Sequence, residues 1–382
     1  MNIPRHLFDS DLEFFRDTLR KFLLAEATPH HDQWEKDGQV SRELWLKAGE
    51  QGFLCPQVPE EYGGVGVDFR YNAVVDEEIY NLGLTGIGWG LHSDIVVPYI
   101  LDYGTEDQKQ HWLPKMVSGE VITAIAMTEP GAGSDLQGVK TTAVRDGDEY
   151  VINGSKTFIT NGQLADLVIV VAKTDPAAGA KGTSLILVEA DRAGFSKGKN
   201  LEKIGMKAQD TSELFFQDVR VPVTNLIGEE GQGFRYLMEC LPQERLNVAL
   251  NAMASCESIL RQTVEYVKER KAFGKKVADF QNTQFKLAEL DSEITAYRVF
   301  VDRCLELHLE GKLDAATAAK AKMVSTDLNS KVADECLQLF GGYGYMWEYP
   351  VARAFADVRV ARIYAGTNEI MKLIVARELL RD

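Results

Sequence analysis

The chain has 382 residues, of which 45% are hydrophobic, so it is long enough for two or three hydrophobic cores. Its net charge of −15 argues against nucleic acid as the main partner and against steady docking on an anionic membrane. The five cysteines are widely spaced and form no Cys-x-x-Cys pair. This indicates buried thiols in a reducing compartment, and neither a disulfide framework nor a metal site is expected.

No stretch approaches the ~18 apolar residues of a membrane span, so stable membrane insertion is not expected. The N-terminus mixes Arg5, Asp9 and Glu13, which is typical of neither a secretory signal nor an acid-poor transit peptide. We therefore expect a cytoplasmic protein if the source is bacterial. A mitochondrial matrix enzyme whose leader has been removed would look the same.

In chain order, the patterns predict an α+β protein of three domains. Residues 1–123 are predicted to be helical, because apolar residues keep helical spacing from Leu12 to Leu23. Residues 124–233 are predicted to be a β-domain, with its clearest strands at 167–172, 184–189 and 213–219. Residues 234–382 are predicted to form a bundle of four helices, at 234–271, 282–310, 315–339 and from 368 onward.

A glycine-rich loop and a predicted hairpin lie at the start of the β-domain. Residues 128–135, Thr-Glu-Pro-Gly-Ala-Gly-Ser-Asp, have the composition of a loop whose backbone can approach a ligand closely. Asn153-Gly154 suits a type I′ turn between 150–152 and 155–160. A site for a flat polar cofactor fits this region, and so does a plain surface turn before a β-meander.

A carboxylate lies in the middle of an apolar seam on the predicted helix that begins at 234. Leu241, Glu244 and Val248 are spaced by three and four residues, so they share one helix face. A buried Glu is costly unless it is paired or used, and burial would raise its pKa and make it a stronger base while ionised. The alternative is that Arg245 pairs with a neighbouring acid and Glu244 lies at the edge of the seam.

The loop motif, followed after the predicted hairpin by Phe-Ile-Thr-Asn-Gly at 158–162, resembles the flavin-binding signature of the acyl-CoA dehydrogenases. The resemblance covers essentially the whole chain. It implies an N-terminal helical domain, a middle β-barrel-like domain and a C-terminal four-helix bundle, with FAD held between the last two. It also implies dehydrogenation of a fatty acyl-CoA to trans-2-enoyl-CoA in β-oxidation, with electron-transferring flavoprotein as the acceptor.

The resemblance points to Glu244 as the catalytic base. Most members carry the base as the Glu of a Tyr-Glu-Gly-Thr motif, and Ala365 holds that position here. Long-chain and isovaleryl-type members instead place the base on the helix that opens the C-terminal domain, and Leu-Pro-Gln-Glu-Arg-Leu at 241–246 is similar to the long-chain version. In the family, a backbone N–H at the Ala365 position and a flavin ribityl hydroxyl polarise the thioester oxygen, and Ala keeps that N–H.

The resemblance also implies the binding residues. Arg270-Lys271-Ala272-Phe273-Gly274 resembles the segment that reaches the FAD of a neighbouring subunit, so a homo-oligomer, in particular a tetramer, is expected. The expected cofactor-binding residues are Ile125, Ala126, Met127, Thr128, Gly133, Ser134, Phe158, Ile159, Thr160, Arg270, Phe273, Gln281, Gln338, Leu339, Phe340, Gly341, Gly342, Thr367, Asn368 and Glu369. The expected substrate-binding residues are Ser134, Pro242, Gln243, Arg245, Ala365 and Gly366.

Three alternatives stay open at this level. The segments 242–245 and 344–350 look most like the long-chain members, but pocket depth depends on packing, so a branched-chain, isovaleryl-like substrate is the runner-up. Ala365 leaves open a catalytically inert flavin- or acyl-CoA-binding relative. An oxygen-using flavin oxidase of the same superfamily is the third, and rapid reoxidation of substrate-reduced flavin by air would favour it.

Overall fold

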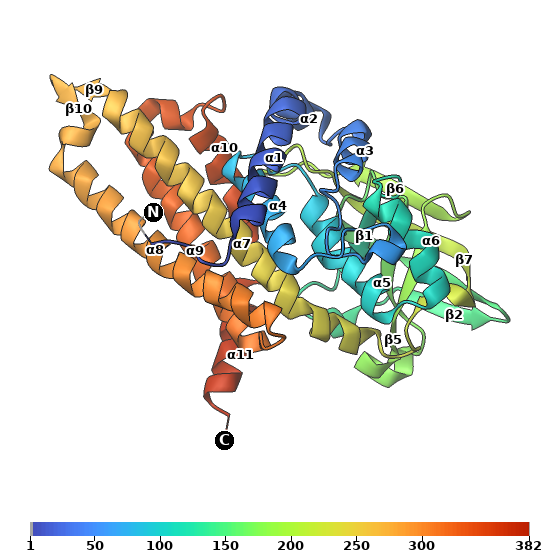
Figure 1. The fold of residues 1–382 in the computed structure, drawn as a ribbon. Coiled ribbons are helices and arrows are strands. Elements are labelled where there is room, and N and C mark those ends of the chain that lie inside the picture. The colour runs from blue at the N-terminus through green and yellow to red at the C-terminus, as the bar shows by residue number, and fades with distance from the viewer. Residues whose placement is uncertain (1–2, 382) are drawn as a thin grey trace.

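The computed structural model describes residues 3–381, which are drawn in Figure 1. The N-terminal part is helical, and polar side chains cap its helices: Asp9 accepts from the backbone at the start of α1, and Thr105 forms a capping box with Gln108 on α6. A π-helix (Leu91–Val96) runs directly into α5. The helices are α1 (Ser10–Glu26), α2 (His31–Asp37), α3 (Arg42–Glu50), α4 (Phe69–Asn81), α5 (Val97–Tyr103) and α6 (Glu106–Val117).

In the described part of the chain, β1 to β8 form one mixed sheet in the order β6-β7-β3-β2-β4-β5-β8, and β1 pairs with β4 in parallel. Every residue of β4 is buried. Ile169 faces the core shared with the N-terminal helices and Val170 faces the core of the sheet, as the two-residue repeat of a strand requires. The strands are β1 (Thr123–Ala126), β2 (Thr142–Asp146), β3 (Glu149–Thr160), β4 (Leu167–Lys173), β5 (Thr183–Glu189), β6 (Phe195–Asn200), β7 (Thr211–Pro222) and β8 (Leu226–Ile227).

The hairpin predicted at Asn153-Gly154 is wrong. Strand β3 runs through both residues, and the turn between β2 and β3 lies instead at Gly147, which has φ +64°. Gly154 lies in a bulge of β3, where the pairing register with β7 shifts. A Cβ at this glycine would lie 2.3 Å from Oγ1 of Thr141, so the close approach of Thr141, and not a turn, requires glycine here.

The C-terminal part is a helical bundle built around α7 and α9, whose apolar faces form one core with α8. Helix α7 continues through Pro242 as a single 37-residue element. The small β9–β10 hairpin lies at the end of α7 that is far from the sheet (Figure 1). None of the helices within residues 3–381 is long and apolar enough to cross a bilayer. The bounds are α7 (Gly233–Glu269), β9 (Lys271–Ala272), β10 (Lys275–Lys276), α8 (Gln281–Leu309), α9 (Ala315–Phe340), α10 (Pro350–Asp357) and α11 (Asn368–Leu379).

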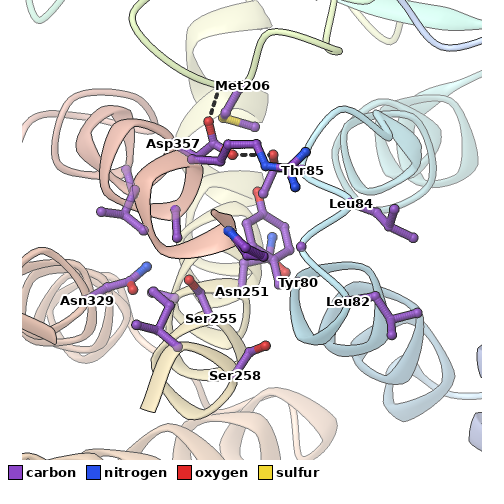
Figure 2. A pocket seen from close by; sticks show the side chains of 18 of the residues that line it. Tyr80, Leu82, Leu84, Thr85, Met206, Asn251, Ser255, Ser258, Asn329 and Asp357 are labelled. Carbon is purple, nitrogen blue, oxygen red and sulfur yellow. Dashed lines mark hydrogen bonds between the residues drawn. The ribbon is translucent and has the colours of Figure 1, made fainter. Parts of the chain in front are cut away.

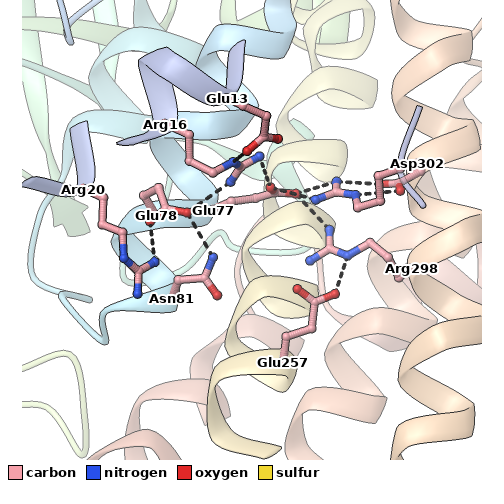
Figure 3. A network of polar contacts seen from close by, with 10 residues as sticks. Glu13, Arg16, Arg20, Glu77, Glu78, Asn81, Glu257, Arg298 and Asp302 are labelled. Carbon is pink, nitrogen blue, oxygen red and sulfur yellow. Dashed lines mark hydrogen bonds and ion pairs between the residues drawn. The ribbon is translucent and has the colours of Figure 1, made fainter. Parts of the chain in front are cut away.

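A buried ionic network joins the N-terminal helices to the bundle (Figure 3). Its centre is Glu77 on α4, whose side chain is 2% exposed. Glu77 accepts hydrogen bonds from Arg5 at 2.8 and 3.0 Å, from Arg16 at 3.1 Å and from Arg298 of α8 at 2.9 Å. Arg5 also pairs with Asp302 of α8, so the network fixes α4 against the bundle.

Candidate active site

Glu244 lies on α7 and is only 4% exposed. The hydroxyl of Tyr99 on α5 donates a 2.8 Å hydrogen bond to its Oε1. Burial raises the pKa of Glu244 to about 7, although the Tyr99 hydrogen bond and the charge of Arg245 both act to lower it. A carboxyl group that titrates near neutral pH suits a general base, because it is substantially ionised and still basic enough to take a proton.

Arg245 does not form the ion pair that the alternative interpretation of this helix required. The residue is 5% exposed, its Nε is buried without a hydrogen-bond partner, and no carboxylate within residues 3–381 lies at ion-pair distance from it. Burial lowers the pKa of its guanidinium, an effect that the charge of Glu244 only partly offsets. Glu244 is therefore inside the apolar seam, and the guanidinium next to it has unused donors.

The turn before α11 is held in a left-handed conformation by a buried lysine. Ala365 and Gly366 have φ values of +52° and +88°. Lys322 of α9, which is fully buried, donates to the carbonyl of Gly366 at 2.8 Å and to Oδ1 of Asn368 at 2.9 Å. Burial lowers the pKa of Lys322 to about 8. These contacts fix the direction of the backbone around Ala365.

A second polar cluster joins α7 to α4 and to the π-helix. Asn247 of α7 donates to the carboxyl groups of Asp76 and Asp94, with a distance of 2.8 Å to Asp94. Gln243 donates to the main-chain carbonyl of Asp94 at 2.7 Å, so its amide is engaged within the protein. Burial raises the pKa of both aspartates, to about 6 for Asp94, and the charge of Asp94 acts in the same direction on Asp76.

A cavity of about 330 Å³ lies between α4, α7 and α10 (Figure 2). Val248, one turn from Glu244, lines it, as does Tyr364, the neighbour of Ala365. Its lining includes polar groups along one face of α7, and Figure 2 shows them facing the segment with Tyr80 and Thr85. The lining residues of α7 are Val248, Asn251, Ala252, Ser255, Ser258, Ile259 and Gln262. The volume is within the range of small-molecule sites.

The predicted cofactor residues fall into two groups, of which the first lies on the sheet. Phe158 on β3 has φ +60° and is 69% exposed, so its ring is accessible to a ligand. The carbonyl of Met127 accepts from Lys156 at 3.0 Å, and the hydroxyl of Thr128 donates to the carbonyl of Thr157. The other members of this group differ in burial. Ile125 and Ala126 on β1 and Ile159 on β3 are buried, and Thr160 at the end of β3 is partly buried. Gly133 and Ser134 are exposed in the glycine-rich loop.

The second group lies at the far end of α7. Arg270 and the segment 338–342 line a common cavity of about 580 Å³. A Cβ at Gly341 or Gly342 would meet no atom within 4 Å, so the backbone there is open to a ligand. The Arg270 guanidinium lies 5.3 Å from the centre of the Tyr343 ring. Phe273, on the β9–β10 hairpin, is 96% exposed.

The remaining predicted residues lie at helix starts. Gln281 is exposed at the first position of α8. Thr367 caps α11 by accepting from the backbone of Ile370, and Glu369 is exposed in the first turn. Asn368 is 1% exposed, and its amide donates to Thr326 and Asp327 at 3.0 and 2.9 Å, which leaves its side chain no free donor for a ligand.

Comparisons with known proteins cover nearly the whole chain. Family models for the N-terminal, middle and C-terminal domains of acyl-CoA dehydrogenases match residues 9–120, 124–219 and 231–380. The chain belongs to the acyl-CoA dehydrogenase family. It is 55% identical to the mitochondrial long-chain specific acyl-CoA dehydrogenase of Sus scrofa over 380 residues, which cover 99% of this chain and 88% of the relative.

Two solved acyl-CoA dehydrogenases share the fold. The enzyme from Geobacillus kaustophilus is 55% identical, with a TM-score of 0.97 and coverage of 99% of this chain and 100% of that chain. The enzyme from Bacillus anthracis, described in complex with FAD, is 34% identical, with a TM-score of 0.92 and coverage of 98% of this chain and 68% of that chain. The family and the three-part fold expected from the sequence are thus confirmed.

Sequence reasoning about this acyl-CoA dehydrogenase missed three parts of the site: Tyr99, Lys322 and the aspartate pair on Asn247. Tyr99 and Glu244 are separated by 145 positions, so no local pattern connects them. Lys322 did carry a signal, because it follows Ala318 and Ala319 by four and three residues, so helical spacing places it on the same closely packed face of small residues.

Proposed function

We propose that this chain catalyses the FAD-dependent α,β-dehydrogenation of a long-chain fatty acyl-CoA to trans-2-enoyl-CoA, with Glu244 as the base. The observation that carries the proposal is a buried carboxylate with a pKa of about 7, one helical turn from Val248, which lines a cavity. The 55% identity to long-chain relatives supports the substrate class. Ala365 does not argue for an inert relative, because Glu244 supplies the carboxylate from another helix.

The residues present fit FAD. An exposed aromatic ring at Phe158 suits the flat isoalloxazine ring. The open glycines at 341 and 342 suit an adenine moiety, and the guanidinium of Arg270 beside them suits a pyrophosphate. Bound FAD supplies the acceptor for the hydride that leaves the β-carbon.

The protein's own part in the reaction is to take the α-proton and to stabilise the charge that develops on the thioester oxygen. Glu244 takes the proton from the α-carbon. The backbone N–H of Ala365 donates to the thioester oxygen, and the Lys322 contact to Gly366 keeps that N–H in place. We assign the unpaired, buried guanidinium of Arg245 to an anionic group of CoA.

The shape of the cavity supports a long acyl chain. Its lining follows α7 from Val248 to Gln262, a span of about 21 Å at about 1.5 Å per residue. An extended long-chain fatty acyl group has a comparable length, whereas an isovaleryl group would fill only the part next to Val248. The mixture of Ala252 and Ile259 with small polar side chains leaves space along this face.

We also propose a homo-oligomer, in particular a tetramer, and electron-transferring flavoprotein as the electron acceptor. The two groups of cofactor residues support the oligomer. Figure 1 shows the β9–β10 hairpin at the end of α7 that is far from the sheet, and α7 is about 55 Å long. One cofactor that contacts both groups therefore takes the Arg270 group from a second copy of the chain.

The function is tested by anaerobic titration of the FAD-loaded protein with palmitoyl-CoA and then isovaleryl-CoA, while the oxidised flavin band is recorded. Stoichiometric bleaching by palmitoyl-CoA is expected. Bleaching by isovaleryl-CoA alone would move the substrate to the branched class, and no bleaching by either would contradict the proposal. Glu244→Gln should keep FAD and acyl-CoA binding but lose turnover by orders of magnitude, while Glu239→Gln, an exposed carboxylate on the same helix, should not.

A further inference from the structure

We propose that Tyr99 is a positioning residue for Glu244: its hydroxyl holds one carboxylate oxygen, so that the other oxygen is aimed at the substrate α-carbon. The inference rests on the proposed function, in which Glu244 takes the α-proton. In this proposal Tyr99 contacts neither the substrate nor the cofactor, and it acts through Glu244.

The contact between the two side chains is short and shielded from water. Tyr99 is fully buried and Glu244 is 4% exposed. The hydroxyl lies 2.8 Å from Oε1, and within residues 3–381 this is the one hydrogen bond that the Glu244 carboxylate accepts. A charge-assisted hydrogen bond in a desolvated setting is strong, and it selects one side-chain conformation of Glu244. Oε2 is then the oxygen available to take a proton.

The backbone around Tyr99 is built to hold this contact. The π-helix passes directly into α5, and a π-turn contains more residues per turn than an α-helix. Within the π-helix, Asp94 is tied to α7 on both sides of Glu244, by Gln243 through its main-chain carbonyl and by Asn247 through its carboxyl group. The start of α5 is therefore fixed against the helix that carries the base, and Tyr99 lies five residues after Asp94.

The titratable and charged groups near Glu244 come from every element packed against this part of α7. Those that act on its pKa are Tyr99 of α5 and Arg245 of α7, and the Cys240 thiol of α7 lies within the influence of the Glu244 charge. Those that lie further away, near Asn247 or Arg245, are Asp76 of α4, Asp94 of the π-helix and Lys322 of α9. The Tyr99 hydroxyl lowers the pKa of Glu244, because its hydrogen bond stabilises the ionised carboxylate.

The test compares Tyr99→Phe with Tyr103→Phe, with kcat/KM measured against pH from 6 to 9 on FAD-loaded enzyme. Tyr103 is the matched control, because it lies one turn further along α5 and donates at 2.8 Å to the exposed Glu239. Tyr99→Phe keeps the ring but loses the donor. The acid limb of its kcat/KM profile should shift to higher pH by about one unit. Its kcat/KM should therefore be about tenfold below wild type near pH 6, and this loss should be partly recovered at pH 9. Tyr103→Phe should keep the wild-type profile.

The outcomes separate this inference from the proposed function. If Glu244→Gln turns over normally, the assignment of the base is wrong. If Glu244→Gln is inactive but the profile of Tyr99→Phe coincides with that of Tyr103→Phe, only the positioning role is overturned. Should Tyr99→Phe not fold, Glu244→Asp tests the same contact from the other side, because it withdraws the carboxylate from the hydroxyl. An unchanged acid limb in Glu244→Asp would overturn the inference.

Discussion

Glu244 imposes a stability cost on this fold that Glu244→Gln should remove. The carboxylate is buried, Tyr99 is its one hydrogen-bond donor among residues 3–381, and its pKa is raised from 4.5 to about 7. The folded protein therefore holds the proton more tightly than the unfolded chain does. The cost is absent below pH 4.5, grows as the pH rises from 4.5 to 7, and is constant above 7.

The size of the effect follows from the pKa change. At about 1.36 kcal/mol per pKa unit, the full cost is about 3 kcal/mol, of which about 2.5 kcal/mol appears between pH 5 and pH 8.5. For a chain of 382 residues that unfolds as one unit, an unfolding entropy of about 2.1 cal/mol/K per residue converts this to about 3 °C. The glutamine oxygen can still accept from Tyr99, and the cost of burying its NH₂ group does not change with pH.

The assay is thermal unfolding at equal protein and FAD concentrations without acyl-CoA, at pH 5 and pH 8.5. The Tm of Glu244→Gln minus the Tm of wild type should be about 3 °C higher at pH 8.5 than at pH 5. Glu239→Gln is the control, because its side chain is about half exposed (48%). A difference between Glu244→Gln and wild type that is the same at both pH values would refute the reasoning, whatever its sign.

Two further substitutions test contacts that hold the site. Glu77→Gln removes the charge that faces the buried Arg298 and leaves Glu257 as its ion-pair partner. Loss of one charged member of a buried network should lower the free energy of unfolding by about 3–5 kcal/mol, which urea denaturation would measure. Glu257→Gln, at the partly exposed edge, should cost less. Lys322→Met removes the donor to the Gly366 carbonyl, so kcat should fall by about tenfold or more with FAD content unchanged; an unchanged kcat would show that the turn keeps its geometry without the lysine.

Local patterns predicted much of this protein because they act over a few residues. Helical spacing located the long helices of the C-terminal bundle to within one or two residues, and it placed Glu244 in an apolar seam where the structure buries it. The same local reasoning failed at Asn153-Gly154. There a turn-forming pair lies inside a strand, because the glycine is needed for contact with Thr141 rather than for chain reversal.

Motifs and helical periodicity, which are properties of neighbouring residues, were enough to predict the family, the fold class and Glu244 as the candidate base. The electrostatic surroundings of Glu244 could not be predicted in this way, because they come from residues far apart in the chain. Its pKa depends on burial and on Tyr99, 145 positions away, and the turn at Ala365 depends on Lys322, 44 positions from Gly366. Electrostatic environment is set by distances in space, and these follow from how the π-helix, α5, α7 and α9 pack together.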